Sequence, residues 1–423
     1  MQITEDDYIA GAGARLPRRR RLFLALLLGL MAAFGPLCTD TYLPSLPALA
    51  ADLNISTATT QLTITACLLG MALGQLFVGP ISDSTGRRKP LFMALIFFTL
   101  ASICCAAAKT GNSFIALRFA QGLGGAGGIV LARAMACDLF RGAELTNFMS
   151  LLMVVNGVAP ITGPMLGGWL ASLAGWPAIF YFLACFGVLL IVLSVFGLPE
   201  TLPQGMRRSG GMRSSWAAMG ELLRQKPFMC YVGVQGFTMG GFFGYVAASP
   251  FVLQGMYGLS PKTYSIIFGC NALSLMFFAF GTARNARRLG EARLLRIGNT
   301  LRAVACVGVL AVTVVSPTSP VPLLIGLFFM IALQGMTLPT SFTIGISAQN
   351  VGAGTASGIL GVSVFIFGAL TSPLVGLAGG GTALPLGIVS AVTGVASALL
   401  GYVGERELKK LRQVNGAAAE PRP

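Results

Sequence analysis

The sequence predicts an all-α polytopic membrane protein whose twelve transmembrane helices form two six-helix bundles. Of the 423 residues, 55% are hydrophobic and only 10% are charged, whereas a soluble domain carries about 25% charged residues. Apolar stretches long enough to cross a bilayer, about 20 residues, recur along almost the whole chain. One long polar connection, residues 199–227, divides these stretches into six and six. A membrane β-barrel would show short alternating segments instead.

Short polar connections, many of them containing glycine or proline, separate the predicted helices, and each helix is an apolar run of crossing length. The predicted spans cover approximately residues 22–46, 59–81, 90–108, 113–137, 146–170, 176–198, 228–251, 263–282, 297–315, 321–343, 355–377 and 382–403. The corresponding organisation is an N-terminal tail (1–21), a first bundle (22–198), a central loop (199–227), a second bundle (228–403) and a C-terminal tail (404–423).

The basic residues predict the orientation in the membrane. Of the 29 Lys and Arg residues, 24 lie in the two tails, the central loop and the alternate loops on the same side, and only two lie in the other loops. Loops rich in Lys and Arg stay in the cytoplasm, so both termini and the central loop are expected there. The net charge of +15 is therefore a topology signal rather than a sign of nucleic-acid binding. The basic, apolar start resembles a secretory signal peptide, but its apolar run is too long and eleven more spans follow.

Cofactor and metal chemistry are not expected. The chain has nine scattered cysteines, no CxxC pair and no histidine, so the spacing of metal ligands is missing. The segment GLGGAG, residues 122–127, matches GxGxxG, but it lies inside a predicted membrane helix and lacks the βαβ context of a dinucleotide site. No P-loop or nucleophile motif is present. We therefore expect no metal, no cofactor, no enzymatic activity and no direct ATP-driven pumping.

Two charged residues lie deep in predicted spans. Asp40 is seven residues before Pro47, at the outer end of span 1, and Arg118 is seven residues after Gly111, at the outer start of span 4. At about 1.5 Å per residue, both lie about 10 Å below the same surface. None of the other thirteen acidic residues lies deep in a span. Ionisable groups in membrane helices face the protein interior or a water-filled cavity and usually find partners.

Two interpretations of Asp40 remain open. A static ion pair or hydrogen-bond network between Asp40 and Arg118 would hold the first bundle together. Alternatively, Asp40 takes up and releases a proton, because burial disfavours the charged form of a carboxyl group and a nearby cation favours it. Arg118 itself does not deprotonate, so it would tune Asp40, bind an electronegative substrate group or organise water. Gln121 lies on the same helix face as Arg118.

Several segments resemble the major facilitator superfamily. The loop GPISDSTGRRK (79–89) looks like the signature loop between spans 2 and 3, and RFAQGLGGAGG (118–128) is similar to the second motif in span 4. The segment GVAPITGPMLGGWL (157–170) resembles the antiporter motif of span 5, and LPET (198–201) fits the end of span 6. DTYLPSLP (40–47) resembles the bicyclomycin-resistance (Bcr/CflA) branch of drug–proton antiporters. A matching loop after span 8, GTARNARRLGEA (281–292), is consistent with an internal duplication.

The resemblance implies a conformational latch at the cytoplasmic side. Gly79 and Gly86 would allow tight turns, and Asp83 would sit at the N-terminus of span 11, near residues 352–357. Arg87 would pair with Asp138 at the cytoplasmic end of span 4. These contacts would hold the two halves in the outward-facing state. The simpler alternative is a turn whose basic residues only set the topology.

The resemblance also implies that the motif of span 5 makes a sealed interface that favours exchange over leak; ordinary close packing is the alternative. The motif residues are Gly157, Pro160, Gly163, Pro164, Gly167 and Gly168. Polar and aromatic residues within the spans, or next to the motifs, are the candidate substrate contacts. They are Tyr42, Gln121, Asn156, Gln235, Phe237, Asn271, Gln334 and Phe367.

The function implied is a proton-coupled antiporter in the bacterial inner membrane. It would work as a monomer and export small lipophilic or amphipathic compounds, such as bicyclomycin or chloramphenicol, by alternating access. A proton-coupled exporter of a metabolite, such as an amino acid or sugar derivative, is the second hypothesis. An uncoupled facilitator or channel is a third, although a channel does not need an isolated titratable group in one half. A membrane sensor would need a large soluble domain, which the central loop and the two tails are too short to supply.

Overall fold

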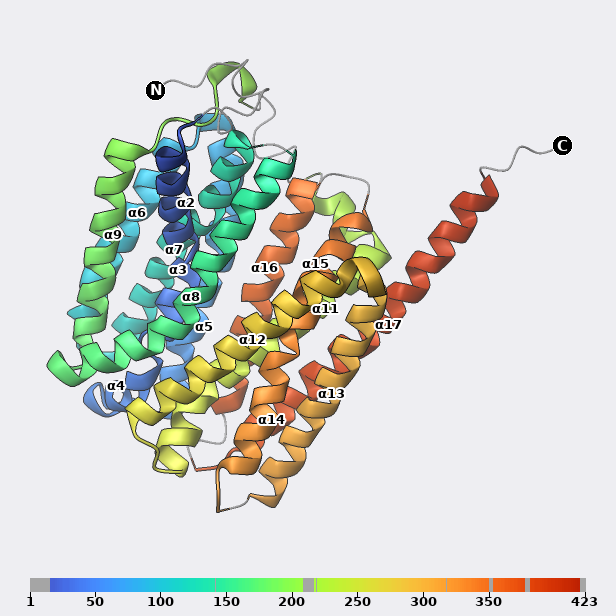
Figure 1. Cartoon of the computed structure of the whole chain (residues 1–423). Helices are drawn as coiled ribbons and strands as arrows, with labels where there is room; N and C mark the ends of the chain where they lie inside the picture. Colours follow the sequence, from blue (N-terminus) through green and yellow to red (C-terminus); the bar gives the residue numbers. More distant parts are fainter. Residues whose placement is uncertain are drawn as a thin grey trace. The chain divides into compact units, whose positions relative to one another are not determined.

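A computed structural model of the protein describes residues 16–140, 142–207, 217, 219–316, 318–349, 353–376 and 381–418. Within these ranges, the side chains of residues 142–147, 149–157, 287, 353, 354 and 411–418 lie outside the description. The described residues form helices joined by short connections and contain no β-strand (Figure 1). The predicted helical class is confirmed for this part of the chain.

The chain divides into two compact units. Unit 1 comprises Met1–Ser214 and Ser249–Cys270, and unit 2 comprises Ser215–Ala248 and Asn271–Pro423. The division at residues 214 and 215 falls in the polar central loop. The segment Ser249–Cys270 groups with unit 1, although the sequence assigns it to the second bundle.

Unit 1 contains nine described helices before the central loop and a π-helical turn, η4 (Phe251–Met256), in its second segment. The helices before the loop are α2 (Arg18–Ala32), α3 (Phe34–Asp40), the short η2 (Leu43–Ser45), α4 (Leu46–Asp52), α5 (Thr57–Thr85), α6 (Arg88–Ala106), α7 (Gly111–Leu139), α8 (Gly142–Ala174) and α9 (Pro177–Gly197). A short turn, η3 (Gln204–Met206), follows α9.

Two helices, α11 and α12, run from one unit into the other, and the remaining helices of the second half belong to unit 2. They are α11 (Lys226–Pro250), α12 (Pro261–Leu289), α13 (Glu291–Val315), α14 (Val321–Ala332), α15 (Gln334–Ser347), α16 (Ala353–Thr371), η5 (Leu374–Gly376) and α17 (Leu384–Ala418). Each of the twelve predicted spans contains a helix.

Ten of the described helical segments are long and apolar enough to cross a membrane, and a bent pair, Arg18–Ala32 with Phe34–Asp52, supplies an eleventh span. The described apolar part of α8 is shorter, Val158–Ala174. The chain is therefore a membrane protein with many spans. The large apolar side chains left exposed on these helices, such as Met93, Phe196 and Val315, suit contact with lipid.

The first span is not the single straight helix that the sequence predicts. It is bent by 42° between α2 and the α3–α4 segment. Pro36 lacks a backbone N–H, and its ring crowds the carbonyl group four residues earlier, which belongs to Ala32, the last residue of α2. The bend therefore separates the basic N-terminal half of the span from the part that carries Asp40.

Close helix contacts in unit 1 depend on glycine. α5 packs along α7, and a Cβ atom on Gly70 would lie 2.9 Å from the backbone nitrogen of Leu123 on α7. A Cβ atom on Gly122 of α7 would in turn clash with the backbone of Cys67 on α5. Small residues let membrane helices approach in this way. The run of glycines in α7 thus serves packing rather than nucleotide binding.

Candidate functional site

Asp40 is the last residue of α3 and is buried, with 2% of its surface exposed. Its Oδ1 atom accepts a hydrogen bond of 2.8 Å from Thr39 Oγ1. α3 packs against both α7 and α8, and Asp40 lies on the α8 side, where a Cβ atom on Gly163 would be 3.5 Å from Asp40 Cβ. The carboxylate therefore sits inside unit 1, against the motif of span 5, and does not face lipid.

Arg118 of α7 is fully buried and, together with Gln121 of the same helix, is bonded to two other helices of unit 1. Its Nη2 atom donates to the backbone carbonyl of Cys38 on α3 over 2.7 Å, and its Nη1 atom donates to Gln121 Oε1. Gln121 Nε2 donates in turn to Ser102 Oγ on α6 over 2.8 Å. Arg118 and Gln121 thus join α3, α6 and α7, and the Gln121 amide is occupied by groups of unit 1 itself.

Aromatic rings complete the surroundings of Arg118. The guanidinium carbon lies 4.4 Å from the ring centroid of Tyr42 and 5.6 Å from that of Phe180 on α9, which are distances typical of cation–π contacts. Tyr42 is fully buried, and its hydroxyl group is 3.1 Å from Thr63 Oγ1 on α5. Tyr42, a predicted substrate contact, lies here as a neighbour of Arg118.

Asp40 and Arg118 do not form the ion pair that the sequence left open. Among the described residues, Asp40 has no ion-pair partner. Their depths match, but the helix face differs. Cys38 and Tyr42, four residues apart, share the face toward Arg118, whereas Asp40 is two residues from each and, at 3.6 residues per turn, points to the opposite side. Arg118 therefore reaches α3 through a backbone carbonyl next to Asp40.

The glycines of α8 bring its backbone against the Asp40 segment. A Cβ atom on Gly167 would clash with the backbone of Thr41, so only glycine fits there. A Cβ atom on Gly168 would lie 3.2 Å from Ser265 Oγ, and this hydroxyl donates to the Pro164 carbonyl over 3.1 Å. The close-packing interpretation of the motif is thus supported at these positions.

Other predicted residues of span 5 give less information. Pro160 and Pro164 lie inside the continuous helix α8, where Pro164 has no backbone N–H to donate. Asn156, a predicted substrate contact, and Gly157, the first motif residue, lie in the part of α8 whose side chains are outside the description.

A cluster of charged residues lies where α5 ends, α6 begins and α7 ends. Arg87 Nε donates to Asp138 Oδ2 over 2.9 Å, as the sequence predicts, and Arg87 Nη1 donates to Asp83 Oδ1 over 2.5 Å and to Ser82 Oγ over 2.6 Å. Thr201 Oγ1 also donates to Asp138 Oδ2, over 2.8 Å. Burial by itself would lower the pKa of Arg87, but the two carboxylates raise it above its ordinary value, so the guanidinium stays charged.

Glu200 completes this cluster, and sequence reasoning did not select it as a site residue. Its carboxylate accepts hydrogen bonds from the backbone nitrogens of Arg87 over 2.8 Å, Arg88 over 3.2 Å and Leu202 over 3.2 Å. A carboxylate is favoured at a helix N-terminus, and Arg88 is the first residue of α6. The LPET segment is the signal that could have indicated it, because it ends a span on the same side as residues 87–89.

The predicted turn at Gly79 is wrong. Gly79 lies inside α5, which continues to Thr85. The polar residues that follow are accommodated within the helix: Ser82 Oγ donates to the Gly79 carbonyl and Thr85 Oγ1 donates to the Ile81 carbonyl, each over 2.7 Å. The turn is made by Gly86 alone, with φ of +92°, a conformation that other residues adopt only under strain.

In unit 2, two predicted substrate contacts meet. The rings of Phe237 on α11 and Phe367 on α16 are half-buried and pack edge to face, with centroids 4.8 Å apart. Gln235 of α11 is buried and donates to the Leu338 carbonyl of α15 over 2.8 Å. The aromatic pair thus joins α11 to α16, and the Gln235 amide joins α11 to α15.

The two other candidates of unit 2 are buried separately. Asn271 Nδ2 donates to Tyr245 Oη over 2.9 Å, and Gln334 Nε2 donates to the Thr238 carbonyl over 3.2 Å. Both side chains are nearly or fully inaccessible. In this structure they join helices of unit 2 to one another.

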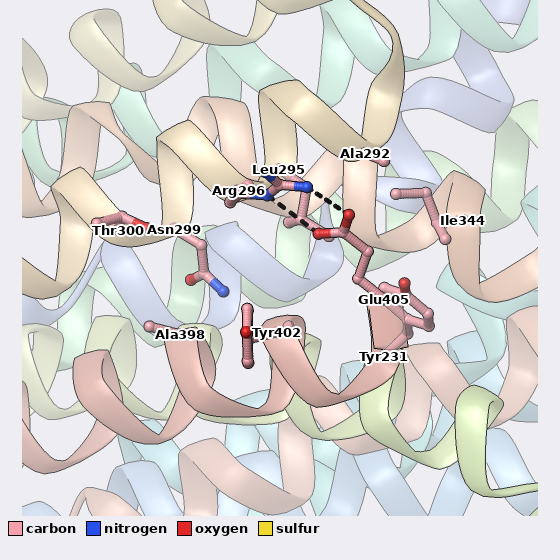
Figure 2. Close-up of a pocket in the computed structure, with 11 residues that line it drawn as sticks. Tyr231, Ala292, Leu295, Arg296, Asn299, Thr300, Ile344, Ala398, Tyr402 and Glu405 are labelled. Atoms are coloured by element: carbon pink, nitrogen blue, oxygen red, sulfur yellow. Dashed lines mark hydrogen bonds and ion pairs between the residues drawn. The ribbon is translucent and has the colours of Figure 1, made fainter. Parts of the chain in front are cut away.

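A small cavity of about 60 Å³ lies in unit 2 (Figure 2). Figure 2 shows Arg296 of α13 and Glu405 of α17, two of the residues that line it, joined by an ion pair. Asn299, Tyr231 and Tyr402 also line it. None of the predicted substrate contacts does, and the volume falls well below the roughly 300 Å³ of a drug-sized site.

The comparisons with known proteins agree with this architecture. Residues 22–373 match the model of the Major Facilitator Superfamily. The chain is 42% identical over 384 residues to "Uncharacterized MFS-type transporter YdgK" of Bacillus subtilis (strain 168), covering 90% of this chain and 95% of that protein. It is 31% identical over 387 residues to "Bicyclomycin resistance protein homolog" of Haemophilus influenzae, covering 91% and 96%.

Solved structures show the same fold. A bacterial homologue of the human lysosomal transporter Spinster, in an inward-facing and unoccupied conformation, superposes with a TM-score of 0.73 at 14% identity, covering 93% of this chain and 99% of that one. A D-xylose–proton symporter superposes with a TM-score of 0.71 at 16% identity, covering 93% and 97%. At these identities the likeness concerns the fold alone.

Proposed function

Because the chain belongs to the Major Facilitator Superfamily, and within it to the branch of the bicyclomycin-resistance proteins, we propose that it is a proton-coupled antiporter. It exports small lipophilic or amphipathic compounds by alternating access. The relative from Haemophilus influenzae is named for bicyclomycin resistance, and relatives from Salmonella, 32% identical over 58% of this chain, are named multidrug resistance protein MdtL.

The observation that carries this proposal is the buried carboxylate of Asp40. It is enclosed by α3 and α8, accepts one hydrogen bond from Thr39 and has no ion-pair partner among the described residues. A carboxyl group that no cation fixes in its charged form changes its proton affinity when its solvent access changes. Asp40 thus suits a group that gains a proton on one side of the membrane and loses it on the other.

The substrate side of the proposal draws on unit 2. The half-buried rings of Phe237 and Phe367 form an apolar surface, and the Gln235 amide lies on the same helix as Phe237. Apolar surfaces with a few polar groups bind amphipathic molecules. The basic loops place both termini in the cytoplasm of a bacterial cell, and the transporter works in the inner membrane as a monomer.

The proposal is tested in proteoliposomes that carry an imposed proton gradient and a pH-sensitive dye. Addition of bicyclomycin, chloramphenicol or a related amphipathic drug is expected to discharge the gradient. Discharge by amino acids or sugar derivatives but not by drugs would identify a metabolite exporter. Substrate movement that ignores the gradient would identify an uncoupled facilitator and overturn the proposal.

We also propose that the cytoplasmic cluster of Asp83, Arg87 and Asp138 controls conformational cycling. Asp83 is 36% exposed and bonded to Arg87, whereas Asp138 holds Arg87 from the buried side. Replacing Asp83 with Ala is therefore expected to slow turnover several-fold, leaving substrate affinity and melting temperature close to wild type because partly exposed pairs contribute little stability.

The measurement compares transport rate with equilibrium substrate binding. Glu221→Ala, which removes an exposed acid of the central region, is the matched control and is expected to cycle at the normal rate. Normal turnover of the Asp83 variant would show that the loop only sets topology.

A further inference from the structure

Arg302 of α13 is a fully buried cation in unit 2 whose hydrogen-bonding groups are mostly unpaired. Its Nη2 atom donates to the Thr238 carbonyl of α11 over 3.1 Å. Its Nε and Nη1 atoms are inaccessible and have no hydrogen-bond partner in the part of the chain that the structure describes. Burying a charge without a partner costs several kcal/mol, so something must compensate Arg302.

Among the described residues of unit 2, no acidic side chain forms an ion pair with Arg302. The acidic residues of α13 and α17 lie near the cytoplasmic ends of these helices. Glu291 starts α13 eleven residues before Arg302, which corresponds to about 16 Å along a helix. Glu405 is bonded instead to Arg296 and to Lys409, as the Arg296 pair in Figure 2 shows. Of these two arginines on α13, Arg296 has a carboxylate partner, whereas Arg302 has none among the described residues.

Arg118 of unit 1 is a second buried arginine, and its guanidinium has more partners than that of Arg302. Arg118 is equally buried, but it has two acceptors, Cys38 O and Gln121 Oε1, and two aromatic rings within cation–π distance. For Arg302 the one acceptor among the described residues is the Thr238 carbonyl, which also accepts a hydrogen bond from Gln334 Nε2 over 3.2 Å. The protein neutralises the first cation far better than the second.

Polar groups around Arg302 indicate what the missing partner is. Gln334 is also fully buried, and its Oε1 atom has no hydrogen-bond partner. Gly241 of α11 and Thr393 of α17 lie next to the guanidinium, because a Cβ atom on Gly241 would be 2.9 Å from Arg302 Nη2 and 2.6 Å from Thr393 Oγ1. The cluster therefore needs negative charge for the N–H groups and a hydrogen-bond donor for Gln334. A hydrated small anion supplies both.

We propose that unit 2 holds a small monovalent anion, of which chloride is the abundant example, against the unpaired N–H groups of Arg302. The anion neutralises the guanidinium, and its water donates to Gln334 Oε1. The site lies among α11, α13, α15 and α17 and is separate from the Asp40 segment of unit 1. Its role is to stabilise unit 2, so it does not depend on which compound the protein transports.

The test uses the purified full-length protein in detergent. Its melting temperature is measured in chloride and in gluconate at equal ionic strength. We expect the melting temperature to rise with chloride concentration and to saturate, because a ligand that binds only the folded state stabilises it. Arg302→Gln is expected to lose this dependence, whereas the matched control Arg296→Gln, on the same helix, keeps it.

Crystals grown in bromide supply an independent readout that does not require the variant to fold. An anomalous peak beside Arg302 supports the site. If Arg302→Gln does not fold, Arg302→Lys keeps the charge with fewer donors and is expected to need a higher chloride concentration for half the shift. Equal melting in chloride and gluconate, a chloride effect that survives in Arg302→Gln, or no bromide at Arg302 would each overturn the proposal.

Discussion

Replacing Asp40 with Asn is expected to reduce proton-driven export to the level of protein-free liposomes while substrate still binds. The amide keeps the size of the carboxyl group and can bond to Thr39, whose hydroxyl group is 2.8 Å from Asp40 Oδ1. It cannot gain or lose a proton in the physiological range. No other acidic residue lies deep in a predicted span, so none can replace it. Drug-induced proton flux and equilibrium drug binding, measured on the same preparation, give the two readouts.

Asp52→Asn is the matched control for this experiment. Asp52 ends the same bent span and is exposed, and its Oδ2 atom accepts a hydrogen bond from Trp176 Nε1 over 2.8 Å. Its substitution is expected to leave drug-driven proton flux unchanged. If the Asp40 variant pumped as well as the Asp52 variant, the proton would have to travel by another route and the proposed mechanism would fail.

The sequence was sufficient to predict the helices but not their breaks. Apolar length alone identifies a span, and each predicted span contains a helix. Whether a proline bends a helix depends on how the neighbouring helices compensate for the lost hydrogen bond. Pro36 ends α2 at Ala32, whereas Pro160 and Pro164 leave α8 continuous. Proline occurrence therefore indicated possible bends without showing which would form.

For the candidate site, the sequence predicted how deep Asp40 and Arg118 lie in their spans, but not toward which neighbouring helix each side chain points. Counting residues from the ends of two spans placed Asp40 and Arg118 at one level, and the structure places Arg118 beside Cys38, two residues from Asp40. Depth changes by only about 1.5 Å per residue, but direction turns by about 100°. A bend in the first span shifts the direction further. For this reason the ion pair inferred from depth is replaced by a bond to the backbone.

The pairing of side chains was easier to predict in the cluster of Asp83, Arg87 and Asp138. The family resemblance implied the pairing of Arg87 with Asp138, and their side chains meet over 2.9 Å. Glu200 follows the end of a span close to the same residues, yet its partners are backbone nitrogens, which no pattern of charges reveals. An ion pair between two side chains can be proposed from their opposite charges. A carboxylate that binds the backbone nitrogens of a helix N-terminus is recognised only when the path of the chain is known.

Replacing Arg118 with Met is expected to lower both the stability and the coupling of the transporter. Methionine fills most of the volume but leaves Cys38 O and Gln121 Oε1 without their donor. A buried acceptor left without its donor costs about 1–3 kcal/mol, and the contacts with the Tyr42 and Phe180 rings are lost as well. We expect a clearly lower melting temperature and weak drug-driven proton flux.

Arg118→Lys separates the role of the charge from that of the contacts. Lysine keeps the cation, but its compact ammonium group cannot reproduce the planar fork that serves two acceptors at once. If Arg118 tunes Asp40, the lysine variant keeps a pH profile close to wild type at a reduced rate, while the residual flux of the methionine variant follows a shifted profile. If Arg118 only joins α3, α6 and α7, both variants lose rate and stability but keep the wild-type pH profile. An unshifted profile in the methionine variant would therefore restrict Arg118 to holding these helices together.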